Sequence, residues 1–500
     1  MLQEPHLRLR AVTFASLLLA STSAAPLLAQ AVVTGTQTDP LRTSVDGDIT
    51  IQSPADGEED DTLLEVTGAT PIVIDSNNSV TVEENATVQA DDADNRVGIE
   101  IESGTNFDLN NAGNIRVTED FVAEDEDLNS IADGPIAEAT NRYGVRILPG
   151  GTTTGSFVNS GDIYVEGLNS FAVSIEGDYV GTIDNTGDIL VAGDGSVAFY
   201  AQSIDGDLRL GGSVQSVGEG SRTVLLDGDI TGTLRVDGVI NNASVFTNEN
   251  GRSLTLSRSD LRESAPTVEV RGDVAGGILI DARPFDLDPD VADEDGDGVD
   301  DIDETNGRIT TNGEAPALLI GSDQDIEIGT VVGRDTTASI VIDGSVNSSS
   351  IYSSFDSNAL VIGGQGGTVN LPGGIGVSGS VSAQTIDSTA VALLINEGVT
   401  AETLDNSGSI TASLTSSGEG TVIAVRDLSG TLTTINNSGF ISANGSNEDT
   451  TIAIDLSRNT TGVTITQFLN DLDAEVLGIV REQNGVVAST EESVAAHQTG

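Results

Sequence analysis

The segment with the most distinctive chemistry in this sequence is the acidic run DEDGDGVDDIDE, which extends from Asp293 to Glu304. Its spacing matches the calcium-loop pattern D-x-D-x-D-G-x5-E. Hard divalent cations prefer carboxylate and carbonyl oxygens, and this spacing can bring several of them around one ion. The predicted ligands are Asp293, Asp295, Asp297, the backbone carbonyl of Val299, Asp301 and Glu304.

The surroundings of this run differ from those of an EF-hand. No helical pattern flanks it, and Asp300 stands where an EF-hand loop usually has an apolar residue. The run resembles the loose extracellular calcium loops of thrombospondin-like repeats. Eleven acidic side chains and no basic one lie between Asp286 and Glu304, so their repulsion keeps the segment open unless a cation neutralises it. We therefore expect calcium binding with a Kd of about 0.1–1 mM. The alternative is a solvated acidic insertion without a specific ion.

A second short motif, Arg271-Gly272-Asp273, matches the integrin-type adhesion tripeptide. Gly-Asp also follows short alternating runs at Gly177-Asp178, Gly206-Asp207 and Gly228-Asp229, where the preceding residue is acidic. This recurrence indicates that a turn requires the Gly-Asp pair and that Arg271 precedes it by chance. We predict a structural role for the tripeptide.

Enzyme chemistry lacks most of its usual reagents in this chain. The two histidines are His6 and His497, at the extreme ends, and there is no lysine or cysteine. A Ser-His-Asp protease is therefore excluded, because no histidine base lies in the body of the chain. A glycosidase needs only two carboxylates, so that reaction stays open. We predict that the protein is not an enzyme. The net charge of −59 also excludes nucleic-acid binding, because the chain repels phosphate.

The elements that would carry these residues are indicated by a repeat. The form N-x-G-x-I occurs at Asn111 to Ile115, Asn159 to Ile163, Asn185 to Ile189, Asn406 to Ile410 and Asn437 to Ile441. Short alternating runs separate the copies, and this period of two predicts strands. Stacking such strands buries one continuous apolar column, so a 26-residue interval is predicted to be one circuit of a solenoid.

Within each circuit we expect the recurrent Asn to form an inward ladder of side-chain amides, with Ile189 and its counterparts buried beside it. The Gly two positions after the Asn is expected to permit a positive φ. The alternative is a string of β-sandwich domains, which need roughly 100 residues each and a buried aromatic core. Aromatic residues are only 3% of the chain, which favours the solenoid. The predicted fold is all-β, a parallel β-helix of irregular 26–50-residue repeats.

The chain divides into five parts by pattern. Residues 1–31 read as an export signal, with Arg8 and Arg10 before an apolar stretch and a cleavage site ending at Ala31. Residues 32–90 are expected to form an irregular, strand-rich cap. Residues 91–470 are expected to form the solenoid, with acidic loops at 119–135 and 284–307. Residues 471–500 lose the pattern and are expected to be a linker or the start of a missing region.

An export signal, N-S-G-x-I repeats, GDVAGGILID and TIAIDLSRNTTGVTIT together resemble the passenger region of bacterial autotransporters, over most of residues 90–470. The resemblance implies a right-handed β-helix carried to the cell surface by a C-terminal translocator barrel. It also accounts for the absence of cysteine, because a disulfide-closed loop would jam passage through a narrow pore. The last residues lack the alternating strands and aromatic girdle of such a barrel, so we expect this chain to be the front part of a longer protein.

The leading functional hypothesis is an exported, surface-displayed passenger with a structural or adhesive role. Its ligand would lie on a host, in a matrix or on a sister cell. The alternative is a secreted β-helix enzyme that acts on polysaccharide through paired carboxylates. A third hypothesis is a calcium-dependent extracellular scaffold that is never anchored.

Overall fold

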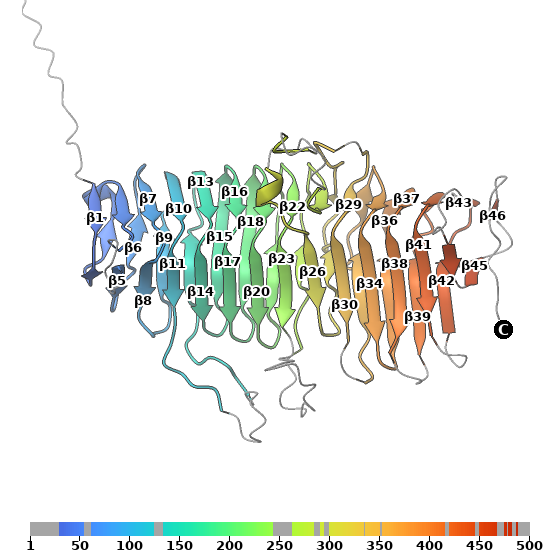
Figure 1. The fold of residues 1–500 in the computed structure, drawn as a ribbon, viewed down its shortest axis with the longest axis horizontal. Coiled ribbons are helices and arrows are strands. Elements are labelled where there is room, and N and C mark those ends of the chain that lie inside the picture. Colours follow the sequence, from blue (N-terminus) through green and yellow to red (C-terminus); the bar gives the residue numbers. More distant parts are fainter. Residues whose placement is uncertain are drawn as a thin grey trace, which may run out of the picture.

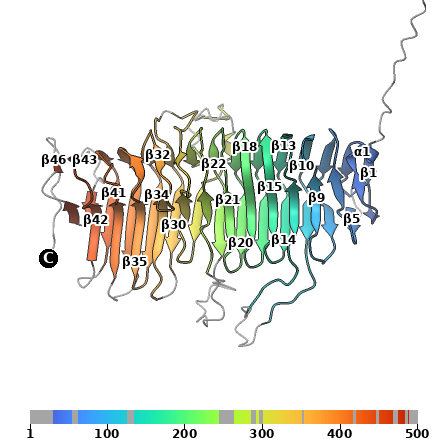
Figure 2. The same ribbon diagram turned by 180° about the vertical axis from the view of Figure 1, so that it is seen from behind.

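A computed structural model describes most of the chain between residues 30 and 488. The described ranges are 30–54, 62–124, 134–243, 263–284, 291–294, 300–334, 336–350, 353–415, 420–445, 450–467, 475–477, 479–482 and 487–488. Parallel strands stack side by side along one long axis, and each coil contributes a strand to each of three faces (Figures 1 and 2). The predicted parallel β-helix is confirmed.

The three faces, here called A, B and C, follow one another in each coil. Face A contains β3 (Leu41–Arg42), β6 (Ile72–Ile74), β9 (Val97–Ile101), β12 (Tyr143–Ile147), β15 (Phe171–Val180), β18 (Val197–Asp205), β21 (Arg222–Leu226), β24 (Val268–Val270), β27 (Leu318–Ile320), β31 (Ser357–Ile362), β35 (Thr389–Ile395), β39 (Thr421–Asp427), β42 (Thr450–Leu456) and β45 (Ile479–Glu482). Face B contains β1 (Ala31–Val33), β4 (Ile49–Ile51), β7 (Ser79–Val82), β10 (Asn106–Asn111), β13 (Thr153–Asn159), β16 (Ile183–Asn185), β19 (Leu208–Leu210), β22 (Leu234–Val236), β25 (Ile278–Ile280), β29 (Ile340–Ile342), β33 (Ile375–Val377), β37 (Thr403–Asn406), β40 (Thr434–Asn437), β43 (Val463–Gln467) and β46 (Val487–Ala488).

Face C is a single 14-stranded parallel sheet. It contains β2 (Thr36–Gln37), β5 (Thr62–Val66), β8 (Ala86–Ala90), β11 (Asn114–Val117), β14 (Asp162–Glu166), β17 (Asp188–Ala192), β20 (Ser213–Val217), β23 (Val239–Ala243), β26 (Arg308–Thr311), β30 (Ser345–Ser349), β34 (Ser380–Thr385), β38 (Ser409–Leu414), β41 (Phe440–Asn444) and β44 (Glu475–Leu477). The remaining elements are short: a small sheet of β28 (Ile326–Glu327), β32 (Val369–Leu371) and β36 (Val399–Ala401), the helix α1 (Thr43–Asp46) and the 3-10 turn Asp301–Asp303.

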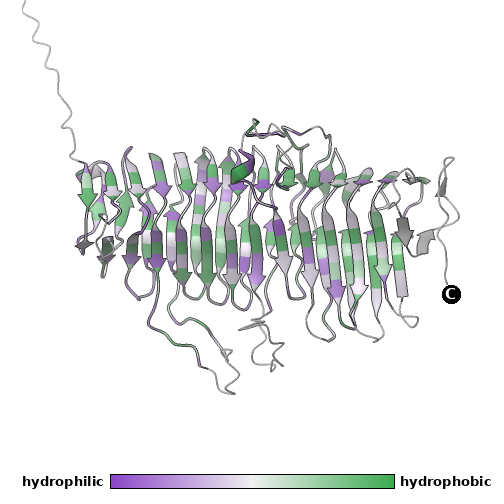
Figure 3. Cartoon of the chain, viewed as in Figure 1, coloured by the Kyte–Doolittle hydropathy of each residue, from purple (hydrophilic) through white to green (hydrophobic). Residues whose placement is uncertain are grey.

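The core is a column of apolar side chains enclosed by the three faces. Alternate residues of each strand point inward, which gives the alternating hydropathy of the strands in Figure 3. On face C, Ile163 pairs with Ile189 and Ile189 with Val214, and each is almost fully buried. The predicted inward position of Ile189 is therefore confirmed. Because each coil contacts mainly its neighbours, stability is expected to be a sum of local terms.

The recurrent Asn forms the inward ladder that the sequence predicts. The side-chain amide of Asn111 donates to Asn159 and that of Asn159 donates to Asn185, both at 2.6 Å. Asn406 donates to Asn437 in the same way, also at 2.6 Å. All five amides are buried at the end of face B, so each bond satisfies groups that water cannot reach. The 26-residue interval from Asn159 to Asn185 is one coil, as predicted.

The Gly of the repeat has a different role from the predicted one. Gly113, Gly161, Gly187, Gly408 and Gly439 do not have a left-handed φ. Instead, each lies against a carbonyl oxygen of the preceding coil. A Cβ at Gly187 would lie 2.1 Å from the carbonyl oxygen of Gly161. The corner between faces B and C therefore requires Gly because the backbones of successive coils pack directly on one another.

We expect Gly187→Ala to lower the stability of the coils around it by about 1–3 kcal/mol, because the added methyl group must push two backbones apart. The midpoint of thermal unfolding measures this. Gly151→Ala is the matched control, since its Cβ would meet its nearest neighbour, Cα of Gly104, at an ordinary 3.5 Å. Equal melting of the two variants would contradict the close-packed corner.

The sheets extend beyond the boundaries expected from the sequence pattern. Strands β4, β7 and β10 pair in order across residue 90, as do β5, β8 and β11. Residues 32–54 and 62–90 thus stack in the same three faces, although they lack the N-x-G-x-I motif. Beyond residue 470, β44 pairs with β41 and β45 with β42. Short strands without the motif therefore still pair with the coil before them.

Both acidic insertions leave the stack between strands. The first connects β11 to β12 and the second connects β25 to β26. At the second, the N–H of Gly307 donates to the carbonyl oxygen of Asp281 at 2.8 Å, so the two ends of the insertion meet. At the first, the carboxylate of Glu119 accepts from the N–H groups of Glu138 and Ala139, each at 2.7 Å. Both insertions therefore have closed bases.

Candidate functional site

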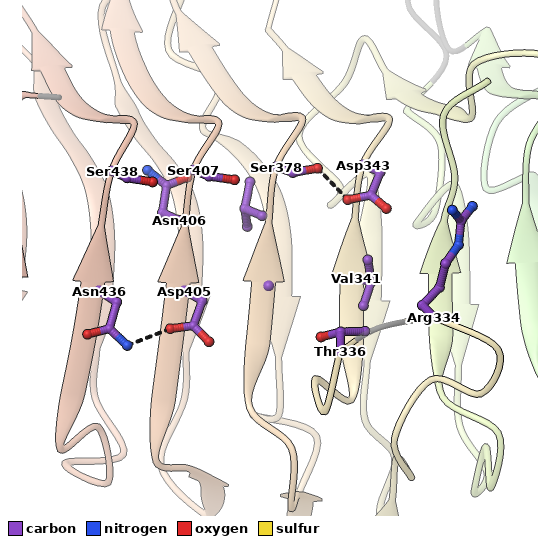
Figure 4. Close-up of a pocket in the computed structure, with 12 residues that line it drawn as sticks. Arg334, Thr336, Val341, Asp343, Ser378, Asp405, Asn406, Ser407, Asn436 and Ser438 are labelled. Carbon is purple, nitrogen blue, oxygen red and sulfur yellow. Dashed lines mark hydrogen bonds between the residues drawn. The ribbon is translucent and has the colours of Figure 1, made fainter. Parts of the chain in front are cut away.

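The candidate site is a groove of about 450 Å³ on the outer surface of face B. It crosses the strands β29, β33, β37 and β40, which pair in that order. Two rows of side chains line it in Figure 4. One row contains Val341, Asp405 and Asn436, and the other contains Asp343, Ser378, Ser407 and Ser438. Strand register places Gly376 in the first row, between Val341 and Asp405. Its volume lies within the roughly 300–1,000 Å³ of small-molecule sites.

The shape of the groove follows from the residues at the outward-facing positions of these strands. Gly376 pairs with Val341 on one side and Asp405 on the other. With no side chain at Gly376, the floor of the groove is low at that point. The second row is supplied by the middle residue of the N-x-G motif, which is Ser407 in one coil and Ser438 in the next. The Asn and Gly of the repeat therefore lie in the core and at the close-packed corner. The residue between them lies in an outer polar row.

Both carboxylates of the groove are already held by a neighbouring coil. Asn436 donates its amide to Asp405 at 2.7 Å, and the hydroxyl of Ser378 donates to Asp343. Each of these hydrogen bonds uses one carboxylate oxygen, Oδ1. Within the described part of the chain, no other residue bonds the hydroxyls of Ser407 and Ser438. The groove thus offers acceptors and donors in fixed positions.

One wall of the groove is the segment between β28 and β29. Val331 and Ala338 from this segment pack on Leu279 and Val341 of face B, and all four are buried. The N–H of Val331 donates to the carbonyl oxygen of Ala338 at 2.9 Å, which closes the segment into a narrow loop. This loop brings Arg334 and Thr336 to the rim. The wall is therefore fixed by its own small apolar cluster.

A chain of buried ion pairs lies beside this wall. Arg235 contacts Glu304, Asp281 at 3.0 Å and Asp237 at 3.8 Å, and the three carboxylates are fully buried. Arg334 pairs with the other oxygen of Asp281. Asp281 therefore links the groove wall, through Arg334, to the acidic insertion, through Arg235 and Glu304.

The chain of charges continues along face B to Arg209, which contacts Asp237 at 2.7 Å and Asp184 at 3.4 Å. Burial raises the pKa of Asp184, and Arg209 opposes that shift. Burial is the largest single influence and would lower the pKa of Arg209, but its hydrogen bond to Asp237 and the charges of the neighbouring carboxylates together outweigh it, and the pKa is raised. Arg209 is therefore held charged by the partner that it neutralises.

The predicted calcium ligands are only partly placed by the structure. Asp295, Asp297 and Val299 lie outside the described residues. The carboxylate of Asp301 accepts from the N–H of Glu294 at 3.1 Å, and Asp293 is half-buried nearby in the chain. Glu304 is directed toward Arg235 and is buried, so its carboxylate is engaged in the ion pair. Among the described residues no group of three or more acidic, His or Cys side chains could hold a metal ion.

The Arg271-Gly272-Asp273 tripeptide is built into the stack. Arg271 pairs with Asp227 at 2.9 Å and with Glu269 at 2.8 Å. The carboxylate of Asp273 accepts from the N–H of Glu327 in the next coil at 2.7 Å, and Asp229 accepts from the N–H of Asp273 at 2.9 Å. These contacts support a structural role for the Gly-Asp turn.

The grouping of the Gly-Asp pairs needs one correction. Register places Asp178, Asp229 and Asp273 in one slot, with Ser203 standing between the first two. Gly206-Asp207 belongs to a different turn, where Asp207 accepts from the N–H of Thr233 at 2.8 Å. The dipeptide is the same in both turns because each needs a Gly and an acceptor for the next coil.

Sequence reasoning did not find the groove or the buried ion pairs. Arg235 and Asp237 alternate with apolar residues, and a charged residue in that pattern is normally solvent-exposed. The available signal was Gly376, an outward strand position without a side chain, but one Gly among 58 does not identify a groove. The histidines at positions 6 and 497 lie outside the described residues.

Comparison with known proteins gave no match: no family model, no curated protein and no solved structure matches this chain. In the described residues no helix has the length and apolar character needed to cross a membrane.

Proposed function

We propose that the protein is an exported, surface-displayed β-helical passenger with a structural and adhesive role. The observation that supports this proposal best is the continuous stacking of three faces from β1 to β46, with long insertions leaving from the corners. Such a stack is a stiff, extended support, and loops that leave such a support are where binding residues are commonly found. The export-signal pattern at residues 1–31 and the strong acidity agree with display outside the cell.

The test is the location and size of the native product. Antibody against residues 91–470 is applied to fractionated cells and to intact cells treated with protease. We expect an outer-membrane product larger than 51.2 kDa that external protease removes, together with loss of cell adhesion or aggregation when the gene is deleted. A product of about the mature mass, free in the medium, would contradict the autotransporter route and favour the secreted alternatives.

A polysaccharide-active enzyme is the second candidate, because Asp343 and Asp405 both line the groove. The strands that carry them are two coils apart, roughly 10 Å, before their offset along the strands is added. Inverting glycosidases hold their carboxylates roughly 6.5–9.5 Å apart. Both carboxylates are also bonded to neighbours. This arrangement favours binding over catalysis. If the protein hydrolyses a glycan and Asp343→Asn or Asp405→Asn abolishes that activity, catalysis would be favoured over binding.

Calcium remains part of the proposal for the acidic insertion. We expect titration of the chelator-treated protein with CaCl2 to give a Kd of about 0.1–1 mM, and Asp293→Asn to weaken it severalfold because one carboxylate ligand is lost. Glu304→Gln is the discriminating variant. Because Glu304 pairs with Arg235, it is expected to lower the thermal midpoint and leave calcium affinity nearly unchanged. If calorimetry detects no heat of calcium binding to the unmodified protein, the remaining interpretation is a solvated acidic insertion without a specific ion.

A further inference from the structure

The groove on face B has the properties of a preformed binding site. Its floor is backbone and apolar at Val341, Gly376 and Val377, and its edges carry the outward polar row. Its wall is anchored twice, by the apolar cluster of Val331 and Ala338 and by the ion pair of Arg334 with Asp281. A ligand therefore meets fixed side chains and does not have to order them.

Backbone pairing restricts what can bind there. Strands β33 and β37 are each paired on both sides, so the floor has no free row of N–H and C=O groups. An extended peptide cannot add to the sheet at this place, because strand addition needs an unpaired edge. The ligand must be recognised by side chains alone.

The chemistry of the side chains favours a polyhydroxylated ligand that carries no negative charge. Asp343 and Asp405 are anionic, and the one guanidinium at the rim, that of Arg334, is neutralised by buried Asp281. An anionic ligand is therefore repelled. Carboxylate oxygens, the Asn436 amide and the hydroxyls of Ser407 and Ser438 can accept from and donate to hydroxyl groups. A sugar ring has an apolar C–H face to cover the floor and hydroxyls at its edge to meet these groups.

We propose that this groove binds a neutral oligosaccharide chain lying across the strands of face B, along the solenoid axis. The outward positions repeat with each coil, about 4.8 Å apart, so successive sugar units meet equivalent rows. The inference rests on the proposed adhesive function and supplies its ligand class: a neutral glycan of a cell surface or matrix.

Isothermal titration of the whole chain tests this with six-unit oligomers. The neutral probes are maltohexaose, cellohexaose, xylohexaose and N-acetylchitohexaose, and the anionic probe is hexagalacturonate. We expect at least one neutral probe to bind and hexagalacturonate to bind more weakly, because the groove carboxylates repel it. Gly376→Val fills the floor; its Cβ would lie an acceptable 3.4 Å from that of Ala338. It is expected to weaken the neutral ligand about tenfold or more.

Asn436→Ala is the second variant, and it is expected to have a similar effect because it removes the amide at the edge. Asn110→Ala is the control: Asn110 is exposed in the same outward row of face B, far along the stack. It is expected to change affinity by less than about twofold. Circular dichroism confirms that each variant is folded.

Three results would overturn the inference. They are no binding of any neutral probe at millimolar concentration, neutral binding that both groove variants leave unchanged, and stronger binding of hexagalacturonate than of every neutral probe. These titrations are independent of the cell-fractionation test. Surface display and adhesion without neutral-glycan binding would reject the groove assignment alone, whereas glycan binding by a protein found only in the medium would reject surface display.

Discussion

Ile189→Asp is expected to be the most damaging single substitution considered for this protein. Ile189 is 1% exposed and lies between Ile163 and Val214 of the adjoining coils. A carboxylate there has no partner and no water, so we expect a loss of roughly 3–5 kcal/mol or more in unfolding free energy. Because neighbouring coils share the column, hydrogen exchange should accelerate first in β14, β17 and β20.

Leu190→Asp provides the matched comparison, since Leu190 is the next residue on the same strand, half-buried on the outer surface of face C. It is expected to cost about 1 kcal/mol or less. If the two variants have the same thermal midpoint and the same exchange pattern, the assignment of inward and outward positions on face C is wrong.

Arg235→Met is expected to have the second largest effect. Arg235 contacts three fully buried carboxylates, those of Asp237, Asp281 and Glu304. Methionine fills similar space but removes the guanidinium that contacts Glu304, while Asp281 keeps Arg334 and Asp237 keeps Arg209. Removing one partner of a buried ion pair costs about 3–5 kcal/mol. Denaturant titration measures the loss, and exchange should increase at the base of the acidic insertion, around Gly307.

Arg42→Met is the control for removal of a guanidinium. Arg42 is 49% exposed, and its partner Asp75 keeps hydrogen bonds from the N–H and hydroxyl of Ser44. Loss of this exposed pair is expected to cost at most about 1 kcal/mol. If Arg235→Met is no more damaging than Arg42→Met, the buried charges contribute little and the groove wall is held by its apolar cluster alone.

The sequence predicted the fold because one motif encodes several structural requirements at once. In N-x-G-x-I, the Asn bonds its counterpart in the next coil, the Gly allows backbone contact and the Ile enters the core of face C. The Asn ladder and the inward position of Ile189 followed from that spacing. The role of the Gly could not be predicted, because a left-handed turn and a close backbone approach both require Gly. Only the structure distinguishes the 2.1 Å approach at Gly187 from a positive φ.

The groove could not be predicted for a different reason. Its residues come from several coils whose intervals differ, so Asp343 and Ser438 become neighbours of one surface only after stacking. The burial of Arg235 could not be predicted either, since it depends on the segment that carries Glu304 back across face B and on the nearby Arg334. Periodicity identifies what a strand contributes to its own core. It does not identify what covers the outside of that strand.

The closed base of the second acidic insertion has a consequence for how this chain can diverge. Asp281 and Gly307 are hydrogen-bonded as neighbours, and Gly307 keeps its place in the corner, packed on the carbonyl oxygen of Val236. At the same place in the next coil, Asp343 and Gly344 are consecutive residues, so the coil follows the same path although 25 residues separate Asp281 from Gly307. Changes in the length of this segment can therefore leave the register of later coils unchanged, provided that Glu304 stays beside Arg235. The rest of the segment can diverge while the stacked coils keep their frame.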